Sequence, residues 1–155
     1  MDEDEMYILD KKVKEFNQTI NKFKEKNNID KLILKEKLND LLGQFEVCLK
    51  GKRIPKKYSR IISAIKYPNN IKKHSESIFK YSLSTLNIYP SNNLYPSSDL
   101  HPSKFKIWWN ELPLDNPKFE NQYNCYNDKL LNKDLLKSIN EVYKIVKEVS
   151  DHYNR

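Results

Sequence analysis

The densest chemical feature of the sequence is a group of positively charged side chains near its middle. Six of them fall within eleven residues: Lys50, Lys52, Arg53, Lys56, Lys57 and Arg60. Cations at this density can neutralise several phosphates of a nucleic acid, and each such contact makes binding depend on salt. The same pattern fits an anionic membrane surface, an acidic protein or simply a solvated helix face.

The charge is gathered in one segment. Residues 50–80 hold ten basic residues and one acidic residue, whereas residues 1–49 hold nine and eleven and residues 81–155 hold nine and nine. The codon bias of an AT-rich genome would raise lysine everywhere, so it does not explain this concentration. Lysines outnumber arginines by 25 to 3, and lysine lacks the bidentate fork that reads base edges. The segment therefore favours contacts to phosphates.

Aromatic side chains form a second candidate binding feature. Trp108 and Trp109 are adjacent and closely follow Lys104 and Lys106. Rings beside cations can stack on unpaired bases, and aromatic or proline-rich arms can dock in the groove of a partner. Large rings in a small protein can equally cover its core. The same alternatives hold for Tyr89, Tyr95, Tyr123 and Tyr126.

Residue types that carry catalysis or bind metals are few and scattered. None of the histidines has a second ligand at metal-binding spacing: His74, His101 and His152. Cys48 occupies an apolar helix position and is expected to be buried, and Cys125 has no adjacent basic residue to activate it. Two glycines cannot form a phosphate-binding loop. We predict no enzymatic activity, no cofactor and no metal site.

The elements that must position these residues begin with two helices. Apolar residues recur at the 3/4 spacing of a coiled coil, first at Leu9, Val13, Phe16, Ile20 and Phe23, and again at Leu34, Leu38, Leu41, Phe45 and Cys48. Asn28 or Asp30 is predicted to cap the second helix, and Gly51 to end it. Because the connection is short, an antiparallel hairpin is predicted. The seams either pack within the chain or bind another chain.

Two shorter helices are predicted to follow. The first begins at Pro55 and ends before Pro68, and its apolar face lies opposite the cations. That face consists of Ile54, Tyr58, Ile61, Ile62 and Ile65. The second runs from about Asn70 to Leu86.

The third quarter of the sequence is rich in proline. Three six-residue units, beginning at Ile88, Leu94 and Leu100, each place a ring before a proline and a serine. Residues that precede proline favour extended backbone, so an extended arm is predicted. The stretch 105–112 fits a helical turn or a short strand. A long helix from about Asn127 to Tyr153, capped by Asn127 or Asp128, is predicted to end the chain.

The sequence as a whole therefore predicts an all-α protein that forms one compact domain. Its parts are a coiled-coil-like helical hairpin (1–50), a basic two-helix segment (51–87), a Pro/Tyr-rich extended arm with the Trp-Trp pair (88–126) and a C-terminal helix (127–155). The acidic start and the absence of an apolar run of about eighteen residues predict an intracellular protein, cytoplasmic or nuclear.

We expect a non-enzymatic scaffold or assembly subunit of a larger complex. Its expected partner-binding residues are Leu9, Val13, Phe16, Ile20, Phe23, Trp108 and Trp109. The alternative is an RNA- or DNA-binding accessory protein that uses residues 50–80, and a second alternative is a peripheral binder of anionic membrane surfaces. No small-molecule substrate is indicated.

Overall fold

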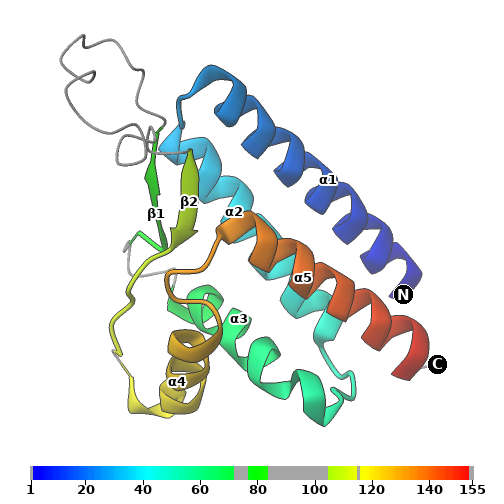
Figure 1. The fold of residues 1–155 in the computed structure, drawn as a ribbon. Helices are drawn as coiled ribbons and strands as arrows, with labels where there is room; N and C mark the ends of the chain where they lie inside the picture. Colours follow the sequence, from blue (N-terminus) through cyan, green and yellow to red (C-terminus); the bar gives the residue numbers. More distant parts are fainter. Residues whose placement is uncertain (1, 72–76, 84–104, 115, 154–155) are drawn as a thin grey trace, which may run out of the picture.

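Two long helices, α1 (Asp2–Lys26) and α2 (Lys31–Leu49), lie side by side and run in opposite directions (Figure 1). The computed structural model describes residues 2–71, 77–83, 105–114 and 116–153, so the three proline-containing units, except for Phe105, lie outside the described residues. Asp30 caps α2, because its carboxylate accepts hydrogen bonds from the backbone N–H groups of Leu32 and Ile33 at 3.1 and 3.2 Å. Of the two predicted caps, the structure uses Asp30.

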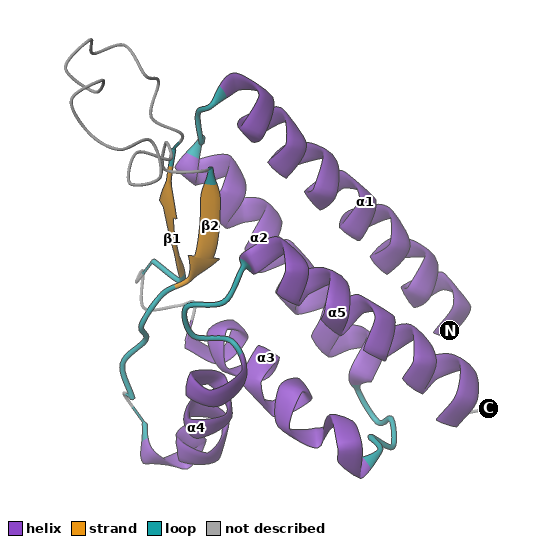
Figure 2. Cartoon of the chain, viewed as in Figure 1, coloured by secondary structure: helices purple, strands orange, loops and turns teal. Residues whose placement is uncertain are grey.

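The last long helix packs along both of these helices. Helix α5 (Leu135–Glu148) contacts α1 and α2, and its inward side chains are fully or almost fully buried. Asn17 of α1 and Asn140 of α5 exchange two amide hydrogen bonds of 3.1 Å. Tyr143 of α5 donates a hydrogen bond to the carboxylate of Asp10. The three helices thus share one apolar core with a polar margin. Their packing against one another can be followed in Figure 2.

A second pair of helices, α3 and α4, covers one end of this core. A 3₁₀ turn at Lys56–Tyr58 leads into α3 (Ser59–Ile71), which packs against α4 (Glu120–Lys129). Tyr67 makes ring contacts with Tyr123 and Tyr126 at centroid distances of 5.6 and 5.9 Å. The prediction that this helix ends before Pro68 is wrong: α3 continues to Ile71. Pro68 is buried near the end of the helix, where packing compensates for one lost backbone hydrogen bond.

The fold is mostly helical, as predicted, but it also contains a small antiparallel sheet that the all-α prediction lacked. Strand β1 (Phe79–Ser82) pairs with β2 (Lys106–Trp109), with Phe79 opposite Trp109. The predicted helix from Asn70 to Leu86 is therefore wrong over residues 79–82. Its partner strand lies more than twenty residues away, a contact that local spacing does not reveal. For residues 106–109, the structure selects the strand from the two predicted alternatives.

The predicted C-terminal helix is interrupted. Helix α4 ends at Lys129 and α5 begins at Leu135, because the intervening backbone pairs with β2 instead. The backbone N–H of Trp109 donates to the carbonyl of Lys133 at 3.2 Å, and the backbone N–H of Asn132 donates to the carbonyl of Trp109 at 3.1 Å. Asn127 and Asp128 lie inside α4, so their predicted role as caps is wrong. The cap of α5 is Asp134.

Within the part of the chain that the structure describes, no helix has both the length and the apolar content needed to cross a bilayer.

Removal of the α5 cap should measurably weaken the fold. The Asp134 carboxylate accepts a hydrogen bond from the Lys137 N–H at 2.8 Å, so Asp134→Ala should lower the free energy of unfolding by about 1 kcal/mol. The matched control is Asn127→Ala, an exposed position inside α4, which should change it by less than about 0.5 kcal/mol. Urea denaturation followed by circular dichroism measures both. The reverse order of the two effects would contradict the placement of the helix start.

Stability should also fall at alkaline pH through Tyr143. Burial, followed by its hydrogen bond to Asp10, raises the pKa of Tyr143 to about 12. The folded state holds this proton more tightly than the unfolded chain, whose tyrosines titrate near pH ~10. The contribution of protonated Tyr143 to the free energy of unfolding is therefore complete below pH ~10 and is lost as the pH rises towards 12. Urea titrations across this pH range should show a smaller loss of the free energy of unfolding for Tyr143→Phe than for Tyr7→Phe. Tyr7→Phe is the control, at an exposed position of α1.

Candidate functional site

The six predicted cations lie where the chain turns from α2 into α3 (Figure 1). Lys50 is the C-terminal cap residue of α2, and the others follow on the connection and on the first turns of α3. Lys52 is half-buried, and the remaining five are exposed: Lys50, Arg53, Lys56, Lys57 and Arg60. The fold therefore presents all six at one corner of the molecule. We call these six residues, together with Lys66 described below, the basic corner.

Local backbone preferences build this corner. Gly51 has a φ of +71°, a left-handed conformation that glycine adopts readily at a helix end. The Lys52 N–H then donates to the carbonyl of Leu49 at 3.0 Å. Pro55 precedes the 3₁₀ turn, and its carbonyl accepts from the Tyr58 N–H at 2.9 Å. These bonds turn the chain sharply and place the next helix beside α2.

The apolar side of α3 faces the core, as its sequence pattern predicts. Ile62 and Ile65 are buried, whereas Ile54, Tyr58 and Ile61 are half-buried against the core. The cations on the opposite arc consequently point outward. Their exposure follows from the amphipathic pattern of the helix itself.

Two side-chain bonds fasten the basic corner to the helices behind it. The Tyr58 hydroxyl donates to the carboxylate of Glu148 on α5, and this hydrogen bond raises the pKa of Tyr58. The Arg60 guanidinium lies 3.2 Å from the Asp128 carboxylate of α4. Both members of this ion pair are about half exposed, so the pair orients Arg60 more than it stabilises the fold.

A cleft opens next to these cations, between α2, the connection and α3. Its volume is about 600 Å³. Lysines and amides from three helices line it, namely Lys50, Lys52, Lys66, Asn69, Asn70 and Gln122, and Glu46 is its acidic residue. Leu49, Ile54 and Ile65 are among its apolar residues. We call it the α2–α3 cleft.

The amide groups of the cleft are only partly engaged with one another. The Asn70 Nδ2 donates to the Gln122 Oε1 at 2.6 Å. Asn69 is 8% exposed and donates through Nδ2 to the Glu46 carboxylate, while its buried Oδ1 accepts no hydrogen bond from any described residue. The cleft therefore brings ammonium groups together with amide donors and acceptors.

Sequence reasoning missed Lys66, the three amides and Glu46. Lys66 lies within the basic segment but outside its dense part, and a chain with 18 asparagines gives no reason to select Asn69 or Asn70. Gln122 comes from a distant segment that only the packing of α4 on α3 brings near. A helical projection that extended α3 beyond Pro68 would have placed Lys66, Asn69 and Asn70 on the same helix.

The residues predicted to bind a partner lie mostly in the core of this chain. Leu9, Val13, Phe16, Ile20 and Trp109 are buried, and Phe23 is half-buried against the same core. The five buried side chains are therefore occupied by packing within this chain. Trp108 is partly exposed, and the Lys80 ammonium lies 5.5 Å from its ring centroid. Tyr123 and Tyr126 serve the α3–α4 contact.

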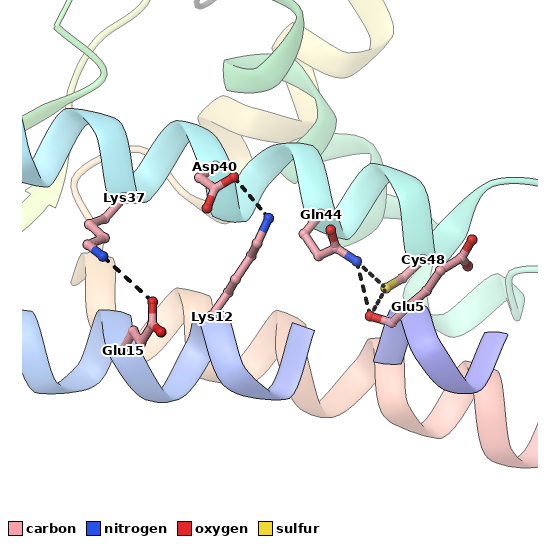
Figure 3. A network of polar contacts seen from close by, with 7 residues as sticks. All are labelled: Glu5, Lys12, Glu15, Lys37, Asp40, Gln44 and Cys48. Carbon is pink, nitrogen blue, oxygen red and sulfur yellow. Dashed lines mark hydrogen bonds and ion pairs between the residues drawn. The ribbon is translucent and has the colours of Figure 1, made fainter. Parts of the chain in front are cut away.

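Polar contacts between α1 and α2 are structural as well. Lys12 pairs with Asp40 at 2.9 Å and Glu15 with Lys37 at 3.6 Å (Figure 3). The Cys48 thiol lies 3.5 Å from the backbone carbonyl of Glu5, and burial raises its pKa. Cys48 and Cys125 are both buried. Among the residues that the structure describes, no group of three or more histidine, cysteine or acidic side chains could hold a metal ion.

Comparisons with protein-family profiles, with curated protein sequences and with solved structures found no match to this chain.

The gathered cations should make the stability of the protein depend on salt. Lys50 and Lys56 make no ion pair with a described residue and lie among like charges, whose repulsion weakens as ionic strength rises from about 10 to about 150 mM. Urea denaturation should show a smaller salt-dependent gain for the double variant Lys50→Gln/Lys56→Gln than for the parent. The matched control is Lys11→Gln/Lys14→Gln on the exposed side of α1. Equal salt dependence in all three proteins would contradict the repulsion.

Proposed function

We propose that this protein binds nucleic acid through the basic corner. The observation that carries the proposal is that the six densest cations of the sequence lie together on the outer side of one turn, five of them exposed. Lys50, Lys56 and Lys66 make no ion pair with any described residue, so their charge is available to phosphates. The role is binding without catalysis, and it needs no cofactor.

Lysine-rich chemistry makes phosphate the main target. Ammonium groups form compact point-charge contacts, so they fix a strand by its backbone and read its sequence weakly. Contact with four or five phosphates would give a slope of log affinity against log salt of about −3 to −3.5 on a single strand. The proposed binding is therefore strong at low salt and largely independent of sequence.

The remaining helices form the support for this surface. We propose that α1 and α2 act as an antiparallel coiled-coil hairpin. Leu9 and Phe16 from one helix and Leu34 and Leu41 from the other are all almost fully buried. The Lys12–Asp40 ion pair connects the two helices at the margin of this seam, as charged pairs do in coiled coils.

Assembly with another protein remains a second candidate function. Several large apolar side chains of α1 and α2 are exposed, the most exposed being Tyr7 at 70% and Leu32 at 76%. These residues, with Ile8, Ile33 and Val47, would replace the buried seam as a surface for the proposed intracellular complex. The expected result is a larger species in light scattering, which variants Tyr7→Ser and Leu32→Ser would reduce.

Reversal of four cations tests nucleic-acid binding. The variant Lys52→Glu/Arg53→Glu/Lys56→Glu/Lys57→Glu should weaken binding to a fluorescent single strand at least about a hundredfold at about 50 mM salt, because phosphate contacts become repulsions. The control changes the same charge on the exposed side of α1, at Lys11, Lys14, Lys22 and Lys24. Fluorescence anisotropy at several salt concentrations gives affinity and slope.

The control should lose much less affinity and keep the parent's salt slope. Equal losses in both variants would mean that total charge, and not the basic corner, governs binding. Binding that does not change with salt would contradict the proposal. Binding to phosphatidylserine-containing vesicles with no binding to the strand would contradict it in favour of a membrane surface.

A further inference from the structure

The α2–α3 cleft has the size and the chemistry of a ligand site. Its volume of about 600 Å³ falls within the range of small-molecule pockets. Such pockets combine apolar walls with a few polar groups that fix orientation, and here Val47, Ile54 and Ile65 stand beside three amides and three lysines. The cleft also shares Lys50, Lys52 and Lys66 with the basic corner, so a nucleic-acid strand bound to that corner would pass directly over the cleft.

The amides offer an edge for a planar, hydrogen-bonding group. With the Asn70 Nδ2 bonded to the Gln122 Oε1, the remaining hydrogen-bonding groups of this pair are an acceptor on Asn70 and a donor on Gln122. An acceptor and a donor can pair with a donor and an acceptor on the edge of a nucleobase, as the single amide of asparagine or glutamine does with adenine; here the two groups come from two side chains.

Asn69 supplies a second, independent observation. This side chain is more than nine-tenths buried and lines the cleft, and its Oδ1 has no hydrogen-bond partner among the described residues. An acceptor left unpaired in such a position costs free energy, and a rotation of the side chain that brought the Oδ1 to the cleft surface would let a ligand N–H recover it. The Glu46 carboxylate, which accepts from the Asn69 Nδ2, has a further oxygen that can accept from an exocyclic amine.

We propose that the α2–α3 cleft takes up one unpaired base of a single-stranded nucleic acid, while Lys50, Lys52 and Lys66 bind the flanking phosphates. This inference rests on the proposed nucleic-acid binding and specifies that the bound nucleic acid is single-stranded. In a duplex the Watson–Crick edges are paired and the bases stacked, so the cleft could not reach them. A fatty acid fits less well, because its apolar tail would cover the remaining hydrogen-bonding groups of Asn70, Gln122 and Glu46 without pairing them.

The test compares three probes of equal length on the full chain. Fluorescein-labelled strands of about twelve nucleotides are used as an intact single strand, an abasic single strand and a blunt duplex. We expect the intact strand to bind about tenfold more tightly than the abasic strand, as the insertion of one base would give. Because both single strands carry the same phosphates, their salt slopes should agree.

Two variants locate the effect in the cleft. Asn70→Ala and Gln122→Ala should each reduce the tenfold difference between intact and abasic strands while leaving the salt slope unchanged. The matched control is Asn121→Ala, an exposed residue of the same helix that does not line the cleft. It should behave as the parent protein does. Circular dichroism melting confirms that all three variants are folded.

The outcomes separate this inference from the function on which it rests. Salt-dependent binding that is equal for intact and abasic strands would overturn base insertion and leave phosphate binding in place. Tighter binding of the duplex than of the single strand would also overturn it. Binding to none of the probes would remove the proposed function itself. Uptake of free adenosine monophosphate without binding of the strand would assign the cleft to a nucleotide and overturn the inference.

Discussion

Burial of the apolar face of α5 against α1 and α2 is the contact on which the rest of the structure depends. Two helices of a hairpin leave their seam open on one side, and each large side chain left there would forfeit roughly 1.5–3 kcal/mol of burial. Ile139 and Val142 of α5 close that side and are fully buried with Leu9 and Leu38. The α1–α2 pair therefore gains its third surface from within the chain.

The position of α5 in turn fixes the smaller elements. The backbone just before α5 pairs with β2 through Trp109, and β2 pairs with β1, so the sheet is attached to the start of that helix. The same pairing ends α4 at Lys129 and lets α4 turn back onto α3. The buried Trp109 ring meets Tyr126 of α4 edge-on at a centroid distance of 6.1 Å. One interruption of a helix thus organises both the sheet and the second helix pair.

Local sequence signals predicted the elements whose causes are local. The 3/4 spacing of apolar residues predicted α1 and α2, and Asp30 has the side chain of a cap. Pro55, the predicted helix start, instead precedes the 3₁₀ turn that leads into α3 at Ser59. The sheet and the break before Asp134 depend on contacts between distant segments, which override a helical pattern that continues through them. The residues of the candidate site also fall into a locally predictable group and a group that packing brings together. The cations of one turn were predictable as a group, whereas Gln122 joins Asn70 only because α4 packs on α3.

Side-chain bonds connect the start of α3, which carries part of the basic corner, to the helices α4 and α5. Tyr58 connects the start of α3 to Glu148 of α5, and Arg60 connects it to Asp128 of α4. A phosphate that competes for Arg60 would release Asp128, which lies 3.9 Å from Lys129 and can keep that partner. Because the exchange replaces one exposed ion pair with another, it costs little. The α5 core that orients the corner is left untouched, so the proposed binding and release of a strand would leave the support of this surface in place.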